Sequence, residues 1–507
     1  MVACNILHIK RWFLTGTFIA MYLLLPLLSS AQAEDNTPIR IEFESGKDWY
    51  EYNYLPLGDQ GVMIINRGKL IHPDTVLWSF TFYDTNFVKK NNIEIKALSN
   101  LLLAGSHFSG EDYYFLFQTS SGRKVPTRSF ILTGITPNID TKENQYTYSE
   151  IFPDLISVSQ ISAVDHHLFL FSTEKENHAI CFYDLAAQKV TKKIDLGNNY
   201  TEFVVLDTAS QKVLIATNEY TNPDGSIGQG FMLYESNYEG SALIKTPFPQ
   251  YEQYQYKSAR LAKTGPGSYL IIGTYNNQTD KKPSNLHSGV YTIVYENSKI
   301  NYPNFFNYTS LKTKDSKAIA KAQNNNLNLQ LVIGDVYSND QQFGFITEVY
   351  YPEYTTTNYY APGSYYVSTP VSTFEGYRFL NAYVTTFDKR GNLLWDNFMP
   401  INEMLTQSLD AKVGLFIDRD NNGYIYYPYG NTITSTLVNN YTILEPILTE
   451  KISSMYQKDI IESTMQTKLE RWYGDTFILT GYQSIRNSNY GKSGKRFVFF
   501  MNRIQYR

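Results

Sequence analysis

The sequence predicts an all-β protein, and three observations support this. The 507 residues include 43 Tyr and 30 Phe, and aromatic residues suit the pleated, half-buried surface of a sheet. Long segments of helix-forming residues are rare. A recurring unit pairs a short apolar strand with a more alternating strand that often carries Tyr-Asp or Phe-Asp before its turn.

Eight such units follow one another along the chain. They are predicted at 61–66 with 78–84, 113–117 with 129–133, 167–171 with 180–184, 213–217 with 230–235, 269–274 with 289–295, 329–334 with 382–396, 413–418 with 423–427, and 476–481 with 496–501. Units of two to four short strands in this number predict a β-propeller of seven or eight blades. A strand at 39–43 is expected to pair with the last strand and close the ring.

A pair of β-sandwich domains is the alternative architecture. No linker rich in Pro, Gly and Ser divides the chain, so residues 34–507 are expected to form one domain. Two segments depart from the repeat: 311–323 contains helix formers and predicts a short surface helix, whereas 451–469 fits either a helix or a strand.

The N-terminus has the pattern of a secretory signal peptide. Lys10 and Arg11 precede an apolar run from Trp12 to Leu28, and small residues end in Ala31-Gln32-Ala33. We therefore expect cleavage after residue 33 and an exported protein, in the periplasm, at the cell surface or secreted. An uncleaved membrane anchor is the alternative. No second segment is long and apolar enough to predict a membrane span in the mature chain.

The cysteine content and the net charge further limit what kind of protein this is. Cys4 would leave with residues 1–33, so Cys181 would remain alone, and its strand-like surroundings predict a buried structural thiol. Without Lys10 and Arg11 the chain has 42 basic and 48 acidic residues, a net charge of −6. No basic tract could follow a phosphate backbone, so nucleic-acid binding is not expected.

A tyrosine- and proline-rich insertion at about 350–378 is the main candidate site. We predict it to be a long blade loop, and long loops in compact domains are more often functional than idle. Tyrosine offers an apolar face and a polar tip, which suits contact with a sugar or a peptide. The candidate ligand-binding residues are Tyr350, Tyr351, Tyr354, Tyr359, Tyr360, Tyr365, Tyr366, Tyr377 and Arg378. Alternatively, the loop packs its own aromatic rings over the propeller face, and Arg378 stacks on one of them.

Motifs for catalysis or metal binding are weak. Residues 418–423 match the first half of a calcium loop, but Tyr429 stands where the bidentate Glu should be, which favours a tight turn. No zinc motif, serine elbow or phosphate-binding Gly-rich loop occurs. We therefore predict no catalytic residue, metal or cofactor, although a pair of carboxylates for glycoside hydrolysis is recognisable only in space.

Three stretches are similar to those of a known family. They are 348–354, then 375–378 leading into 391–397, and finally 472–474 before 481–483. Together they resemble a family of uncharacterised exported β-propeller-like proteins of Bacteroidota bacteria. The resemblance covers most of the mature chain and implies a bacterial envelope setting. It implies no particular activity for this chain, because the family has no established catalytic residue.

The sequence thus favours a non-catalytic binding or scaffold module for an envelope protein or glycan. A glycan-active enzyme with a carboxylate pair in the propeller channel is the alternative. A structural subunit of an envelope complex is a third possibility, which a broad exposed apolar patch would indicate.

Overall fold

The structure is a computed structural model. It describes residues 39–45, 52–108, 112–119, 129–135, 147–151, 158–174, 177–197, 199, 201–221, 227–278, 286–308, 311, 327–360, 368–456, 458–487 and 494–505. The predicted signal peptide and all but residue 311 of the predicted helix at 311–323 lie outside these ranges.

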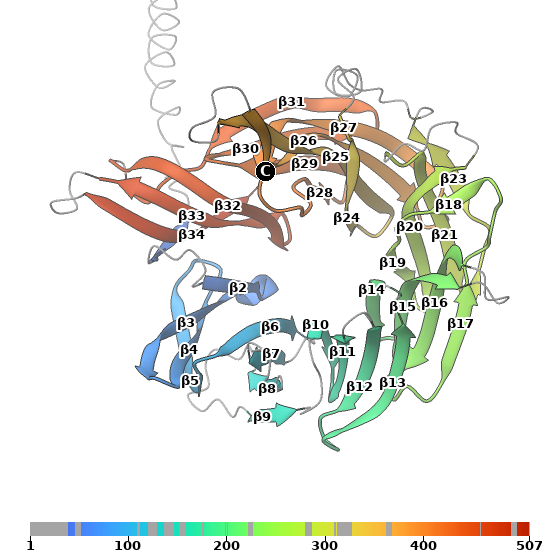
Figure 1. Cartoon of the computed structure of the whole chain (residues 1–507), viewed down its shortest axis with the longest axis horizontal. Helices are drawn as coiled ribbons and strands as arrows, with labels where there is room; N and C mark the ends of the chain where they lie inside the picture. The colour runs from blue at the N-terminus through green and yellow to red at the C-terminus, as the bar shows by residue number, and fades with distance from the viewer. Residues whose placement is uncertain are drawn as a thin grey trace, which may run out of the picture.

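The described strands form eight antiparallel sheets, which we number 1 to 8 in chain order and which stand around a common centre (Figure 1). Sheet 1 contains β2 (Tyr52–Pro56), β3 (Val62–His72), β4 (Thr75–Tyr83) and β5 (Lys89–Leu98), and sheet 2 contains β6 (Leu101–Phe108), β7 (Tyr113–Thr119), β8 (Ser129–Ile135) and β9 (Thr147–Ile151). Sheet 3 contains β10 (Val158–Val164), β11 (His167–Glu174), β12 (Asn177–Asp184) and β13 (Lys189–Gly197), and sheet 4 contains β14 (Thr201–Asp207), β15 (Lys212–Thr221), β16 (Ile227–Asn237) and β17 (Leu243–Pro247).

Sheet 5 contains β18 (Tyr254–Tyr256), β19 (Arg260–Gly265), β20 (Ser268–Asn277), β21 (Gly289–Glu296), β22 (Lys299–Ile300) and β23 (Asn304–Asn307), and sheet 6 contains β24 (Gln330–Ser338), β25 (Gln342–Tyr360), β26 (Ser368–Asp388) and β27 (Leu393–Thr406). Sheet 7 contains β28 (Gly414–Ile417), β29 (Asn422–Tyr429), β30 (Thr432–Asn439) and β31 (Thr442–Lys451), and sheet 8 contains β32 (Ile460–Tyr473), β33 (Thr476–Arg486), β34 (Lys495–Gln505) and β1 (Arg40–Glu44).

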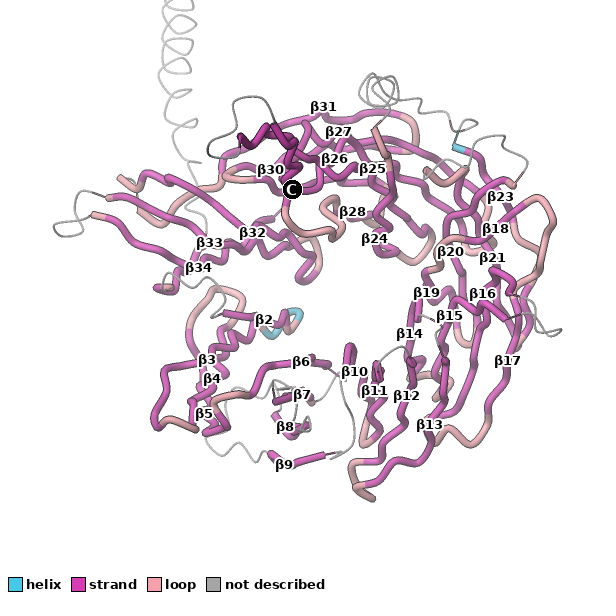
Figure 2. Tube along the Cα trace, viewed as in Figure 1, coloured by secondary structure: helices cyan, strands magenta, loops and turns pink. Residues whose placement is uncertain are grey.

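This ring of small antiparallel sheets is a β-propeller, as the sequence predicted. Six of the predicted hairpins are the two middle strands of a sheet, such as β11 with β12 and β33 with β34. Strands predominate throughout, and η1 (Gly58–Gln60) is a single turn of 3-10 helix (Figure 2). Among the described residues, no helix has the length and apolarity needed to cross a bilayer.

The two ends of the chain close the ring, which confirms the predicted pairing. β1 is the outermost strand of sheet 8 and runs antiparallel to β34, with Ile41 opposite Met501 and Phe43 opposite Phe499. Sheet 8 then packs on sheet 1, where the indole N–H of Trp472 donates to the carbonyl oxygen of Gly61 at 2.7 Å.

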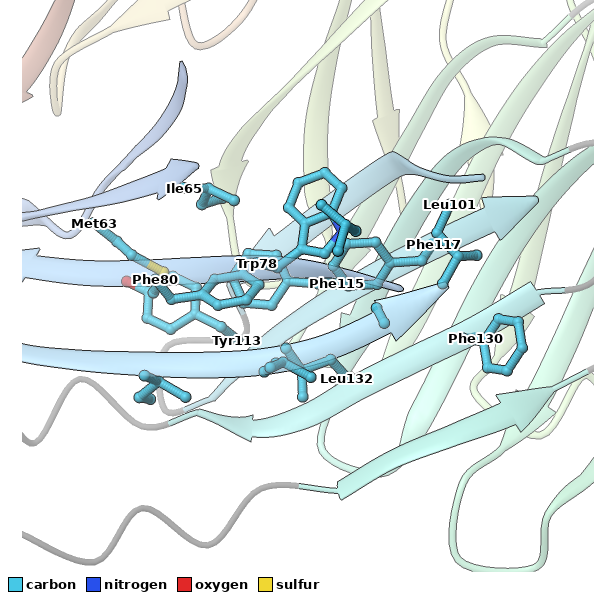
Figure 3. Close-up of a cluster of buried hydrophobic side chains, with 14 of the residues drawn as sticks. Met63, Ile65, Trp78, Phe80, Leu101, Tyr113, Phe115, Phe117, Phe130 and Leu132 are labelled. Carbon is cyan, nitrogen blue, oxygen red and sulfur yellow. The ribbon is translucent and has the colours of Figure 1, made fainter. Parts of the chain in front are cut away.

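The core lies between neighbouring sheets. Between sheets 1 and 2, Trp78 contacts Phe117 with ring centroids 5.1 Å apart, and Phe80 contacts Phe115 at 4.9 Å (Figure 3). Cys181 is buried in a similar cluster, as predicted, and burial raises the pKa of its thiol.

One irregular segment differs from its prediction, and a second, which the sequence left open between a helix and a strand, is a strand for much of its length. The insertion at 350–378 is not a loop along most of its length, because β25 and β26 stay paired as far as Tyr360 and Ser368. The ambiguous segment 451–469 begins at the last residue of β31 and continues as a strand from Ile460.

Candidate functional site

The Tyr-rich insertion forms a hairpin that extends beyond its own sheet. β24 pairs with β25 only as far as Gln330 opposite Tyr350, and β27 pairs with β26 only as far as Thr406 opposite Tyr377. Beyond these points β25 and β26 pair only with each other. We call residues 351–360 and 368–376 the projecting hairpin.

The composition explains why this segment stays extended. Tyr and the run Thr355-Thr356-Thr357 favour strands, and Pro352 costs no ladder bond because this part of β25 has no partner on its other side. The register shifts between Glu353 and Tyr354, where β26 has one extra residue, Glu375; the neighbouring Gly376 has a φ of 145°, which glycine adopts without strain.

One face of the hairpin carries aromatic rings that lead from the core into solvent. Tyr350 is buried, and its hydroxyl donates to Oε1 of Gln330 at 2.6 Å. From Tyr350 the ring centroids follow at 5.6 Å to Tyr377, 5.0 Å to Phe374 and 5.5 Å to Tyr354. Because Phe374 and Tyr354 are 39% and 57% exposed, the end of this row is available for contact.

The opposite face carries an ion pair. Arg378 donates to Glu353 through Nε and, at 2.9 Å, through Nη2. The hydrogen bond from Arg378 holds the pKa of Glu353 below its ordinary value. Since this guanidinium already has a carboxylate partner within the hairpin, its first role is to tie β25 to β26.

The remaining candidates differ in their positions. Tyr351 and Tyr377 are half-buried. Tyr359 and Tyr360 belong to β25, opposite Thr369 and Ser368, and their side chains are outside the described set, as are Tyr365 and Tyr366 altogether. Sequence analysis missed Phe374 and also Val371, which is 46% exposed, because a predicted loop gave no strand register; the structure places them opposite Tyr354 and Thr357.

A pocket of about 970 Å³ lies on the face of the propeller opposite to the projecting hairpin. It is lined by the turns that join β19 to β20, β24 to β25, β28 to β29 and β32 to β33, and by the turn after β26. β25 starts at this end with Phe343 in the pocket wall and finishes in the projecting hairpin. The two candidate sites therefore occupy opposite ends of the propeller.

Well-capped turns build the pocket rim. Oδ1 of Asp418 accepts the backbone N–H groups of Asp420 and Asn422, both at 2.8 Å, and Asp388 caps the turn after β26 in the same way. Residues 418–423 thus form the predicted turn. Among the described residues, no group of three or more His, Cys, Asp or Glu side chains could hold a metal ion.

Charges of both signs line the pocket. The lining includes exposed Lys389 and Arg419 and exposed Asp340 and Asp420, and none of these four side chains forms an ion pair within the described chain. The guanidinium of Arg471 lies over the ring of Phe416, 4.8 Å from its centroid. This wall can contact a polar ligand through charge and through aromatic surface.

One cation of the pocket is already neutralised. Lys263 donates to the buried carboxylate of Asp207, which also accepts from the hydroxyls of Tyr269 and Ser210. Burial alone would raise the pKa of Asp207, but these three hydrogen bonds hold it well below its ordinary value. Asp207 therefore ties sheet 4 to sheet 5 and is not free to act as an acid.

Comparisons with solved structures show similar rings of sheets. They include the C-terminal WD40 domain of Sif2 (9% identity over 92% of this chain and 97% of that chain, TM-score 0.41). They also include the Dos1 propeller (8% identity, 91% and 96%, TM-score 0.38) and the β-propeller domain of the Trilobed protease from Pyrococcus furiosus (9% identity, 80% and 95%, TM-score 0.34). None of the protein-family models matches the sequence, and neither does any curated protein. At such low identities these likenesses concern the fold and say nothing of a ligand or an activity.

Proposed function

We propose that this β-propeller is an exported, non-catalytic binding module of the bacterial envelope. In this proposal the projecting hairpin contacts a partner protein or glycan, and the ring of sheets holds it in place. The signal-peptide pattern of residues 1–33 and the resemblance to exported Bacteroidota proteins support the location.

The observation that carries the proposal is the row of rings from Tyr350 to Tyr354. An isolated two-stranded hairpin is only marginally stable in water, and cross-strand aromatic contacts stabilise it by about 0.5–1.5 kcal/mol each. Here the row starts at a buried ring and ends at the exposed rings of Phe374 and Tyr354. A contact surface held in this way loses little conformational entropy when it binds.

A double variant tests the proposal. Tyr354→Ser with Phe374→Ser removes the exposed rings and leaves Tyr350 and the rest of the core in place. The matched control is Val88→Ser with Leu102→Ser, since both of these residues are 54% exposed and lie far along the chain from the hairpin, Val88 just before β5 and Leu102 in β6. Tagged chains starting at Glu34 would be incubated with envelope extract and with an array of envelope glycans.

The proposal expects a specific protein or glycan that the parent and the control retain and the Tyr354/Phe374 variant loses. Circular dichroism and thermal unfolding would show that both variants remain folded. Equal retention by all three chains would contradict a binding role for the hairpin.

A glycan-active enzyme remains the second candidate, because the pocket combines a concave surface with several Asp side chains. Asp340, Asp420 and Asp475 line it, but all three are exposed, whereas the general acid of a glycosidase needs a buried setting. Release of reducing ends from envelope polysaccharides, abolished by Asp340→Asn with Asp420→Asn, would favour the enzyme over the binding module.

A further inference from the structure

β31 is exposed along its whole length. All ten residues from Thr442 to Lys451 are exposed, and they include Ile443, Leu444, Ile447 and Leu448, at 61%, 49%, 49% and 53%. β31 is the last strand of sheet 7, pairs only with β30 among the described strands and lies on the outer rim of the ring (Figure 1).

Other strands at the rim bury part of their apolar surface. β5 alternates between exposed residues and buried Ile93, Ile95 and Ala97, and β13 buries Ile194 and Leu196. β31 instead places adjacent aliphatic residues on both of its faces and buries none of them.

Aliphatic residues on both faces are typical of a strand that is covered on both faces. An outer strand also leaves a row of N–H and C=O groups without partners, and proteins normally protect such edges with charge, proline or a covering element. β31 has Pro446, Glu445 and Glu450, but four large aliphatic side chains remain uncovered. These features leave the outer edge of β31 open to pairing with another chain.

We propose that β31 is a self-association surface and that its occupant is β31 of a second copy, antiparallel to the first across a two-fold axis at Leu448. This arrangement places Glu445, three residues before Leu448, opposite Lys451 of the second copy, three residues after it. The same pair then forms twice. Neither Glu445 nor Lys451 forms an ion pair within the described chain, so both charges are available.

The packing of the pair follows from the same register. The paired segment runs from Glu445 to Lys451 of both copies, so Leu448 meets its own counterpart at the axis and Ile447 lies opposite Thr449, whereas Ile443 and Leu444 lie beyond the end of the second β31. Pro446 faces Glu450 of the second copy and donates no hydrogen bond, and the register of β31 against β30 shifts at the same place, so the ladder between the copies is weakened there.

Sedimentation velocity over a range of protein concentrations tests this surface, with the chain from Glu34 onward so that every described strand is present. The parent should form a dimer. Leu448→Lys places two positive charges at the axis and should weaken association by at least about tenfold, whereas Val88→Lys, at an equally exposed apolar site in the turn before β5, should not.

Charge reversal tests the register. Glu445→Lys alone and Lys451→Glu alone should each weaken association roughly two- to fivefold per contact, and the double variant should restore it. Glu445 and Lys451 of one strand are too far apart to pair with each other, so recovery reports a contact between copies. A parent that stays monomeric, a dimer that tolerates Leu448→Lys, or a double variant without recovery would each overturn the proposal.

Discussion

At the scale of single residues, Glu348 combines complete burial with incomplete hydrogen bonding. Its Oε1 accepts the backbone N–H groups of Lys412 and Val413, both at 2.8 Å, and so joins sheet 6 to the start of sheet 7. Its Oε2 is buried and has no hydrogen-bond partner among the described residues. Burial raises the pKa of this carboxyl from 4.5 to about 8, against the opposing effect of the two N–H groups.

Glu348 should make stability depend on pH. The folded chain keeps this proton up to about pH 8, whereas the unfolded chain releases it near pH 4.5, so raising the pH between these values favours unfolding. The parent should lose up to about 1.4 kcal/mol per pH unit relative to Glu348→Gln in this range. Urea unfolding of both chains at several pH values measures the difference, and Glu94→Gln, at an exposed position, is the control. Parallel curves for parent and Glu348→Gln would contradict the assignment.

Some residue roles could be predicted from sequence and others could not. The Asp that ends many strands was recognisable, because a carboxylate there can cap the turn that follows, as Asp84 does for Asn86 and Val88. Tyr350 and Tyr354 belong to the same pattern in the sequence, yet one is buried and the other exposed. The length of the neighbouring strand β24 decides between them, and the local sequence of β25 does not contain that length.

At the scale of elements, β1 is the strand on which ring closure depends, and Arg40 holds it. The side chain of Arg40 donates to Oε1 of Gln483 at 2.7 Å, to Oδ1 of Asn502 at 2.9 Å and to Glu42, and it lies over the ring of Phe500. Only 1% of this side chain is exposed. Its hydrogen bonds therefore form away from water, where an unpaired partner is costly.

Replacing Arg40 should loosen the closure. Arg40→Met keeps an apolar side chain of similar length but leaves buried oxygens without donors, and the free energy of unfolding should fall by about 3–5 kcal/mol. Hydrogen exchange should show lost protection in β1 before other strands. Arg390→Met, at an exposed position without an ion pair in the described chain, should change stability little. A similarly small effect from Arg40→Met would show that other contacts hold β1.

The projecting hairpin shows where prediction of elements fails. Tyrosine, proline and glycine between two strands suggested a loop, whereas the strands continue through most of it. Pro352 is compatible with a strand only because β24 has already ended, and that depends on the partner strand. By contrast, the middle strands of the sheets were predictable, because strands such as β7 are buried on both faces and are almost continuously apolar.

At the scale of the whole molecule, the ring separates three surfaces. The projecting hairpin and the charged pocket lie at opposite ends, and β31 lies on the rim. The repeat along the sequence predicted the ring and its closure. It did not predict which sheets form the pocket, because turns more than 200 residues apart, such as those at Lys263 and Asp475, meet only after the ring has closed.

The measurement that tests the binding proposal most directly is photo-crosslinking at single positions. A benzophenone amino acid would replace Phe374 in one chain and Val88 in another, and both chains would be irradiated in envelope extract. The account predicts a discrete adduct with a protein or glycan at position 374 and none at 88. Equal adducts at both positions, or none at 374 while the chain stays folded, would contradict the hairpin as the binding site.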